Sequence, residues 1–406
     1  MSGVSLGEAT AVQPRRATGA IQWPLVCAAL TAVVALGYAV AGVAAANVVA
    51  LLGVGLALGV ALYHAAFGFT SAFRVFLADG QGAGLRAQLV MLAVACVLFF
   101  PALAAGSLFG HPVNGHAAPL NTSLVVGAFL FGLGMQLGGG CASGTLFAVG
   151  GGSARMVLTL LFFIVGSVVG VAQLPFWAAL PGLPAVSLVA SFGWPAALAG
   201  NLVVFSLLWL VVAAIERRRH GRLQPIASGG HFLRGPWPLA AGAVALAAFN
   251  FATLALAGRP WGITSAFGLW GAKLLGLGGL DVSGWGGWAE PAQRAALAQP
   301  VLADITSVMD FGIMLGALLA AGLAGRFVLL QKLPPRQAAA SVIGGLLLGY
   351  GARLAYGCNI GAFFSGVAAG SLHGWVWVAC ALGGSFVGLK LRPFFGLQVE
   401  RRLAAC

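Results

Sequence analysis

Charged side chains are what this 406-residue sequence has least of, and acidic ones are especially scarce. Asp and Glu together number 8, Lys and Arg number 21, and charged residues make up 7% of the chain. A soluble domain carries about 25% charged residues, so an ordinary soluble protein is excluded. The net charge of +13 is typical of the basic cytoplasmic loops of a membrane protein and does not indicate a nucleic-acid partner.

Motifs for metal binding and for thiol redox chemistry are also missing. The six cysteines lie far apart in the sequence, so there is no CxxC pair and no zinc spacing. The six histidines form no ligand spacing with one another. We therefore predict no metal site, no cofactor and no enzymatic activity. Cys27, Cys96 and Cys380 lie inside apolar runs, where we interpret them as packing residues.

What the sequence has instead is a series of long apolar runs. Hydrophobic residues make up 60% of the chain. Runs of about 20 residues, long enough to cross a bilayer core, recur between residues 22 and 390. They indicate an all-α polytopic membrane protein with about ten transmembrane spans. No small-residue cleavage site precedes residue 47, so the first run is predicted to be a retained helix. The predicted spans are 22–44, 47–66, 85–109, 122–152, 155–176, 195–215, 237–257, 305–325, 341–371 and 372–391.

A glycine-rich motif that contains a cysteine occurs twice, 217 places apart. The first copy ends in Gly138-Gly-Gly-Cys141-Ala-Ser-Gly144 and the second in Tyr356-Gly-Cys358-Asn-Ile-Gly361. Isolated glycines let transmembrane helices approach one another closely. Three glycines followed by a cysteine instead indicate a break within the helix, so a broken helix is predicted at each copy.

A second string, Gly-x-Thr-Ser-Ala-Phe, occurs at 68–73 and again at 262–267, ahead of the cysteine motif in each half. Two independent strings in the same order indicate internal duplication. The segment 67–84 is too short and too polar to span, which predicts a short re-entrant segment in each half. The predicted organisation is a cytoplasmic tail and extra helix (1–46), a first repeat (47–194), a linking helix and basic loop (195–235), a second repeat (236–392) and a cytoplasmic C-terminal tail (393–406).

The distribution of basic residues predicts the orientation. With both termini in the cytoplasm, ten crossings place 16 of the 21 Lys and Arg residues on the cytoplasmic side. The same map enters the first repeat from outside and the second from inside. We therefore predict two inverted repeats, related by a pseudo-twofold axis in the membrane plane.

Substrate sites of inverted-repeat transporters lie near the bilayer midplane, where broken helices meet. Cys141 and Cys358 fall in the middle of their predicted broken spans. Half-helix N-termini at Ser143 and Asn359 offer backbone N–H groups to an anion, and a polarisable thiol favours a sulfur-bearing partner. The bland alternative is that both cysteines are small packing residues. The adjacent glycines, which leave room for a ligand, are Gly139, Gly140 and Gly357.

Each of the other polar residues in the predicted spans has two possible interpretations. Arg353, whose repeat mate is Gln136, either holds an anion on its route or snorkels to the cytoplasmic side about two turns away. The hydroxyl pairs of the repeated string either line a pathway or cap short helices. These pairs are Thr70 with Ser71 and Thr264 with Ser265.

These motifs, together with Arg74 after the first Gly-x-Thr-Ser-Ala-Phe string, resemble the YeeE/YedE sulfur-transport family over roughly residues 47–392. The resemblance implies an inner-membrane protein of hourglass shape that takes up thiosulfate, with Cys141 and Cys358 as central thiols that hydrogen-bond to it. Many members have a further cysteine where this chain has Gly68. That departure leaves the substrate open between thiosulfate and another sulfur or selenium anion.

Three further points stay open at this stage. A membrane thiol oxidoreductase or sulfur relay using the two motif cysteines is the alternative function. A cytoplasmic sulfur-accepting protein would be a partner, with the basic loop 216–235 as a place for it to dock. Coupling to an ion cannot be read from the sequence, and Asp310 is the one acidic candidate within a span.

Overall fold

The computed structural model describes residues 19–329 and 332–399, and these residues are mostly helical. Within them, ten segments are long and apolar enough to cross a membrane, as the sequence predicts. The tail residues 1–18 and 400–406 lie outside the described residues, so the predicted cytoplasmic tails are only partly covered.

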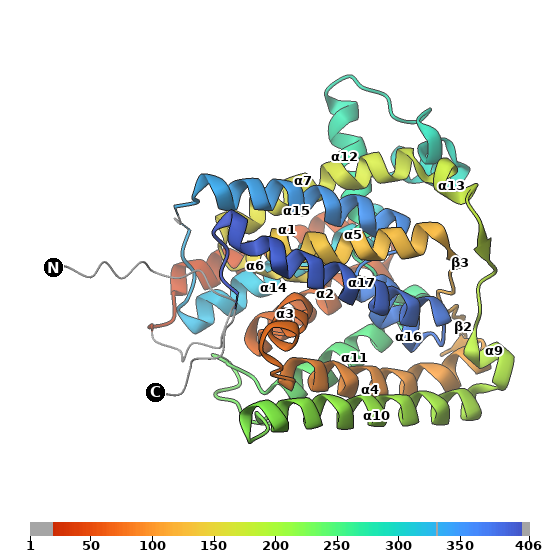
Figure 1. The fold of residues 1–406 in the computed structure, drawn as a ribbon. Helices are drawn as coiled ribbons and strands as arrows, with labels where there is room; N and C mark the ends of the chain where they lie inside the picture. Colours follow the sequence, from red (N-terminus) through yellow and green to blue (C-terminus); the bar gives the residue numbers. More distant parts are fainter. Residues whose placement is uncertain (1–18, 330–331, 400–406) are drawn as a thin grey trace.

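The first half of the chain contains α1 to α10 (Figure 1). The elements are α1 Trp23–Ala41, α2 Ala46–Ala65, α3 Phe69–Asp79, α4 Ala83–Ala105, β1 Ser107–Leu108, β2 His111–Pro112, β3 Leu120–Asn121, α5 Thr122–Gly138, α6 Ala142–Gly150, α7 Ala154–Ala172, α8 Leu174–Ala178, β4 Gly182–Leu183, α9 Leu188–Phe192 and α10 Trp194–His220. The only sheets among the described residues are the two-stranded pairs β1–β2 and β3–β4.

The second half begins with α11 and ends with a short 3-10 turn. The elements are α11 Leu239–Ala257, α12 Thr264–Leu277, η1 Gly286–Ala289, α13 Pro291–Ala298, η2 Val301–Ala303, α14 Ile305–Ala324, α15 Pro335–Leu354, η3 Asn359–Phe364, α16 Ser365–Ala368, α17 Leu372–Leu391 and η4 Arg392–Phe395. The predicted spans agree with these helices to within a few residues, except that α15 starts at Pro335 and α10 runs on to His220.

Both predicted helix breaks are present. The chain leaves α5 at Gly139, which has a left-handed backbone (φ +94°), and Cys141 is the N-cap of α6. In the second half α15 ends at Leu354, and Cys358 is the N-cap of η3, a π-helical turn that continues into α16. The predicted short segments are the 11-residue α3 and the 14-residue α12.

Helix contacts come in matched pairs. α7 packs on α15 as α5 packs on α17, and α2 packs on α14 as α4 packs on α11. α12 meets α7 as α3 meets α17, whereas α5 and α15 contact each other. If the chain consists of two duplicated halves, each helix contact must have a counterpart when every helix is replaced by its equivalent in the other half. The contacts show this pattern. The inversion of one half relative to the other stays our prediction.

Glycines allow a close crossing of α5 and α15. A Cβ added at Gly344 would lie 2.2 Å from the Gly138 nitrogen. A Cβ at Gly127 would lie 2.8 Å from the Gly351 carbonyl oxygen, and one at Gly134 would lie 2.9 Å from that of Gly344. The two backbones therefore touch directly, as small residues permit in transmembrane helix pairs.

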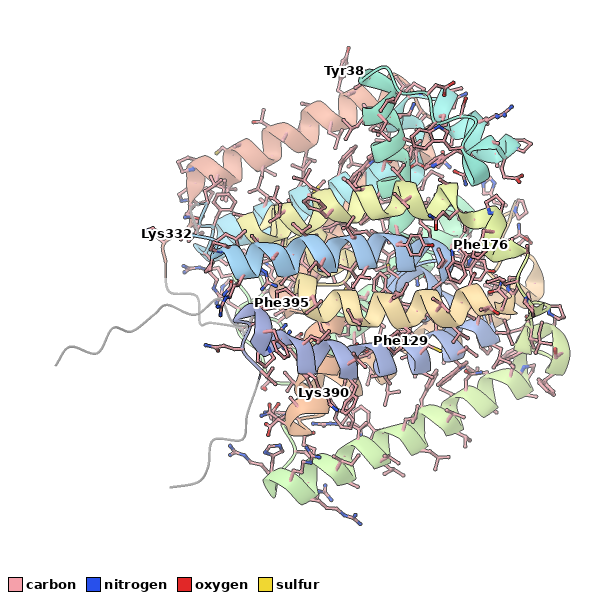
Figure 2. All side chains as sticks on the ribbon, turned by 45° about the horizontal axis from the view of Figure 1, so that its top comes forward. Tyr38, Phe129, Phe176, Lys332, Lys390 and Phe395 are labelled. Carbon is pink, nitrogen blue, oxygen red and sulfur yellow. The ribbon has the colours of Figure 1, made fainter. Side chains whose placement is uncertain are left out.

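The outward faces of the helices are apolar. Tyr38 is 85% exposed and Phe176 is 63% exposed, and Figure 2 shows Tyr38 projecting away from the helices. Many Val and Leu side chains of α7 and α10 are exposed in the same way. Such a surface is unstable in water and suits contact with lipid.

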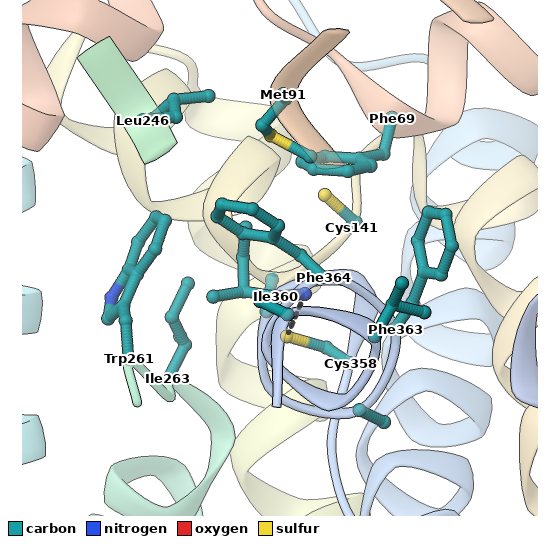
Figure 3. Close-up of a cluster of buried hydrophobic side chains, with 14 of the residues drawn as sticks. Phe69, Met91, Cys141, Leu246, Trp261, Ile263, Cys358, Ile360, Phe363 and Phe364 are labelled. Atoms are coloured by element: carbon teal, nitrogen blue, oxygen red, sulfur yellow. Dashed lines mark hydrogen bonds between the residues drawn. The ribbon is translucent and has the colours of Figure 1, made fainter. Parts of the chain in front are cut away.

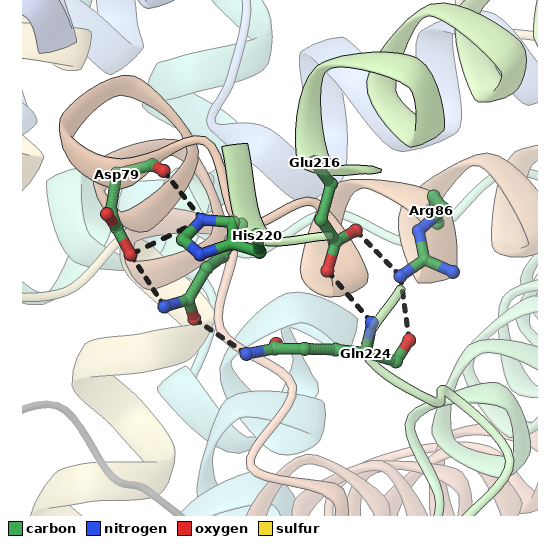
Figure 4. A network of polar contacts seen from close by, with 6 residues as sticks. Asp79, Arg86, Glu216, His220 and Gln224 are labelled. Atoms are coloured by element: carbon green, nitrogen blue, oxygen red, sulfur yellow. Dashed lines mark hydrogen bonds and ion pairs between the residues drawn. The ribbon is translucent and has the colours of Figure 1, made fainter. Parts of the chain in front are cut away.

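A buried polar network fixes the end of α10 against α3 and α4 (Figure 4). Arg86 and Glu216 form a salt bridge of 2.8 Å, and both side chains are almost fully buried. Glu216 also accepts from the Gln224 backbone N–H, and His220 contacts Asp79. The basic end of the linking helix is thereby held at one face of the molecule.

Candidate functional site

The first cysteine motif places a thiol at the start of a helix. Cys141 is 1% exposed, and its Sγ lies 3.4 Å from the Ser143 hydroxyl oxygen. Its carbonyl accepts from the Thr145 hydroxyl at 2.8 Å. Gly139 and Gly140, which precede the thiol, line the same cavity as Cys141.

The second motif repeats this arrangement without the serine. Cys358 is 0% exposed, and its Sγ accepts a hydrogen bond from the Ile360 backbone N–H at 3.4 Å. Gly357 has φ +145°, and its carbonyl accepts from the Trp377 indole at 3.3 Å. In each motif, therefore, the sulfur contacts the residue two places further on.

The two thiols belong to one buried cluster. Cys141 and Cys358 are both members of the largest hydrophobic core, and α6 contacts η3. In Figure 3 the two thiols lie in the same close-up, with the rings of Phe69, Phe363 and Phe364 around them. The halves of the chain thus bring their cysteine motifs together, and aromatic rings close the surrounding space.

A cavity of about 300 Å³ reaches Cys141 from one side. Thr70 and Ser71 line it, as the pathway reading of the first hydroxyl pair requires. Among the described residues that line it none is acidic and three are arginines, a composition suited to an anion. These arginines are Arg74, Arg155 and Arg392.

Two of the arginines also complete the broken helix. The last carbonyls of a helix have no intrahelical partner. Arg392 donates to the Gln136 carbonyl and Arg155 to the Leu137 carbonyl, each at 2.6 Å. The Thr159 hydroxyl donates to the Gly138 carbonyl at 3.1 Å. Cations at a helix C-terminus also favour its dipole, so the break is stabilised where the cavity forms.

Sequence reasoning missed these arginines as site residues and used them only for orientation. Arg74 carried a local signal, because it directly follows the Gly-x-Thr-Ser-Ala-Phe string. Arg155 and Arg392 carried none, since their partners on α5 lie 18 and 256 places away.

The hydroxyl pairs do not cap helices through their side chains. The N-cap of α3 is Gly68 and that of α12 is Ile263, and neither helix has a side-chain cap bond. Ser71 donates back to the Gly68 carbonyl at 3.1 Å, and Ser265 donates to the Thr306 hydroxyl at 3.1 Å. The capping interpretation is therefore wrong, because each pair lies inside the helix rather than ahead of it.

Arg353 lies far from the start of its helix. It occupies the last turn of α15, 18 residues after Pro335, or roughly 27 Å along the axis. Its guanidinium donates to the Thr264 carbonyl at 3.2 Å. Because α15 begins earlier than the sequence predicts, snorkelling toward the start of the helix would need Arg353 to reach back along most of its length. Arg353 contacts the second repeated string instead.

Further polar groups lie close to the second motif. The Asn121 amide donates to the Tyr356 hydroxyl at 2.6 Å, and the Tyr356 ring meets His373 edge-on. His116 packs against His373, and burial lowers the pKa of His116, with a smaller effect from Arg259. His116 is therefore neutral near pH 7.

Among the described residues of the second half, two fully buried amide or carboxyl side chains have no hydrogen-bond partner. Both amide atoms of Asn359 and both carboxyl oxygens of Asp310 are unbonded, and each residue is 0% exposed. The structure thus places eight of the predicted residues in two groups. Gly139, Gly140, Cys141, Thr70 and Ser71 share the arginine cavity, whereas Arg353, Thr264 and Ser265 meet at the start of α12.

Ten apolar spans around a buried, glycine-broken pair of helices define a polytopic membrane transporter. The chain matches the profile of a family described as sulphur transport over residues 64–387. The protein therefore belongs to the sulphur transport family, as the repeated motifs indicate.

Proteins similar to this chain carry transporter names. It is 28% identical to the thiosulfate transporter TsuA of Spirochaeta thermophila over 345 residues, which covers 80% of this chain and 92% of that protein. It is 27% identical to TsuA of Escherichia coli over 346 residues, 79% and 88% of the two chains. A shorter match of 33% identity links it to the probable transporter YedE of Escherichia coli, over 36% of each chain.

Proposed function

We propose that this protein imports thiosulfate, or a similar small sulfur-containing anion, across the bacterial inner membrane. The observation that carries the proposal is the cavity of about 300 Å³, whose described lining includes three arginines and the Cys141 thiol but no acidic residue. Such a site attracts a small anion and offers its sulfur a soft hydrogen-bonding partner. The names of the two TsuA relatives support thiosulfate as the substrate.

In this proposal the two thiols are successive binding positions along one transport path. Cys141 faces the arginine cavity, whereas Cys358 is enclosed within the core. With the N-terminus in the cytoplasm, the cavity opens inward. The anion then passes Cys358 when the surrounding rings shift, and reaches Cys141 before release. The thiols donate weak hydrogen bonds to the anion and do not change it covalently.

Uptake of radiolabelled thiosulfate into proteoliposomes tests this function. Replacement of Cys141 or Cys358 by Ala is expected to lower the uptake rate at least about tenfold, since each change removes a hydrogen-bonding partner from a narrow path. Cys380→Ala is the matched control, because Cys380 is a half-buried free cysteine on α17 outside both motifs. Wild-type uptake by both motif variants would overturn the thiol path.

The same variants address the oxidoreductase alternative. A redox relay needs a Cys141–Cys358 disulfide during turnover, which mass spectrometry of the working protein would detect. The transport proposal expects both thiols to stay reduced. The family and the names of the relatives favour transport.

The proposal also includes a cytoplasmic sulfur-accepting partner. The basic stretch Arg217, Arg218 and Arg219 is exposed at the end of α10, and Phe232 is 73% exposed in the loop that follows. With both termini cytoplasmic, this loop lies on the side where the cavity opens. A cross-linker placed at residue 232 is expected to trap such a partner in cells that take up thiosulfate.

A further inference from the structure

Asp310 in α14 is unusual among the acidic residues that the structure describes. It is 0% exposed, and neither of its carboxyl oxygens has a hydrogen-bond partner. Each of the other described acidic residues is either exposed or hydrogen-bonded. These are Asp79, Glu216, Asp281, Glu290 and Asp304. An unpartnered acid inside a membrane span is strongly unfavourable when ionised, and such residues mark functional sites.

The position of Asp310 connects it to the proposed path. Thr306, one turn earlier on the same face of α14, bonds the Ser265 hydroxyl of the second repeated string. One turn later, the Met314 carbonyl meets the backbone of α6 at Gly150, where an added Cβ would be 2.2 Å away. The flanking residues Met309 and Ile313 belong to the core cluster that contains both thiols.

Few other titratable or charged groups are carried by the elements that pack on α14, namely α1, α2, α6, α12 and η2. The carboxylate of Asp304, beside η2, caps α14, and Arg259 ahead of α12 donates to Thr306. Lys273 on α12 donates to the Leu297 carbonyl. α6 carries no charged side chain and starts after the thiol of Cys141. The remaining groups are Cys27 and Tyr38 on α1, and Tyr63 and His64 in the last turn of α2.

The charge of the substrate makes a coupling site necessary for accumulation. Thiosulfate is a dianion, and the interior of a cell is electrically negative. Each negative charge lowers the attainable inside-to-outside ratio roughly fortyfold per 100 mV of membrane potential. A transporter that accumulates such an anion must therefore move compensating positive charge with it.

We propose that Asp310 is a proton-binding site that couples anion uptake to proton influx. The carboxyl takes up one proton from the outer side, carries it in neutral form through the buried state seen here, and releases it to the inner side with the anion. The proton offsets one of the two negative charges, so each cycle moves one net negative charge inward, and the proton gradient supplies the driving force for accumulation. This inference rests on the proposed function. It assigns the coupling ion to a proton because the carboxyl is fully buried without a hydrogen-bond partner among the described residues, and burial of this kind favours the neutral, protonated form.

Two assays in proteoliposomes separate coupling from passage of the substrate. The first measures accumulation of labelled thiosulfate under an inward proton gradient, and the second measures counterflow into vesicles preloaded with unlabelled thiosulfate, without any gradient. We expect the wild-type protein to show both activities. Asp310→Asn is expected to lose at least about tenfold in gradient-driven accumulation while its counterflow stays within about threefold of wild type.

Two further variants sharpen the result. Asp310→Glu keeps the carboxyl and is expected to retain part of the accumulation. Asp281→Asn is the control, because Asp281 lies in the loop after α12 and bonds only its neighbour Ser283. It is expected to behave as wild type in both assays.

Any of the following outcomes would overturn the proposal that Asp310 couples uptake to protons. Wild-type accumulation by Asp310→Asn would do so, as would accumulation that follows a sodium gradient and not a proton gradient. Loss of counterflow in both Asp310→Asn and Asp310→Glu would assign the residue to substrate passage or to folding. Absence of counterflow in the wild-type protein would instead overturn the proposed function, and this inference with it.

Discussion

Gln136 and Arg353 occupy equivalent positions in the two halves and make equivalent hydrogen bonds. Gln136 donates to the Thr70 carbonyl at 3.4 Å, and Arg353 donates to the Thr264 carbonyl at 3.2 Å. The two threonines are themselves equivalent within the repeated Gly-x-Thr-Ser-Ala-Phe string. Each broken helix thus holds the short helix of its own half through one side chain. The two hydrogen bonds differ in charge, since only the donor of the second, Arg353, is a cation.

Arg353→Gln is expected to separate the hydrogen bond to the Thr264 carbonyl from the positive charge of the side chain. Glutamine preserves a donor for the Thr264 carbonyl, as Gln136 shows, but removes the positive charge. We expect thermal stability to stay near wild type and the KM for thiosulfate uptake to rise about tenfold, the loss of one charge-assisted contact. Arg353→Ala, which also removes the donor, is expected to lower stability as well. An unchanged KM in Arg353→Gln would show that the charge has no part in uptake.

The accessibility of the two thiols should differ strongly. Cys141 lines the arginine cavity, whereas Cys358 is enclosed by the core. In variants that keep only one of the two cysteines, a negatively charged methanethiosulfonate reagent is expected to modify Cys141 at least about ten times faster, because thiol reactivity follows access and nearby positive charge. Mass spectrometry of timed samples measures both rates.

Thiosulfate provides the control for that measurement. It should slow the modification of Cys141, because both anions occupy the same cavity. Equal rates for the two thiols, or modification that thiosulfate does not slow, would contradict the proposed site.

The helix breaks could be predicted from the sequence because their cause is local. Consecutive glycines end α5, and a cysteine then caps the next helix. The capping of the exposed carbonyls could not be predicted, since Arg392 reaches Gln136 from 256 places away. The length of α15 could not be predicted either, because Pro335 starts the helix before the apolar run does and thereby places Arg353 at the far end. Burial of Asp310 without a partner is likewise a property of the packed structure.

Close packing of α5 on α15 makes Gly344 intolerant of any side chain. A Cβ there would lie 2.2 Å from the Gly138 nitrogen and 2.6 Å from its Cα, and a backbone segment cannot yield as a side chain can. Gly344→Ala is expected to destabilise the protein by about 1–3 kcal/mol, the usual range for overpacking. Thermal unfolding in detergent measures the difference.

Gly53→Ala is the matched control for that substitution. Gly53 lies within α2, and nothing stands within 4 Å of an added Cβ. Because alanine is favoured over glycine in a helix by about 0.5–1 kcal/mol, this variant should be as stable as wild type or slightly more so. Equal loss of stability in the two variants would contradict the direct backbone contact.

Gly68 is the position at which the family resemblance implies a third cysteine, and the structure can accept one. Its backbone is extended, with φ −107°, so a side chain brings no backbone strain. The closest atom to an added Cβ is the Ser71 hydroxyl oxygen at 2.4 Å, which can rotate away; the next is 3.6 Å distant. Gly68 also lines the arginine cavity, so the new thiol would join Cys141 there.

Gly68→Cys is therefore expected to fold and to lower the KM for thiosulfate by about threefold to tenfold, the value of one additional hydrogen bond. Gly68→Ala adds the same Cβ without the sulfur and should leave the KM unchanged. If both variants change uptake equally, the effect comes from the volume of the side chain, and a thiol at this position contributes nothing to recognition of the anion.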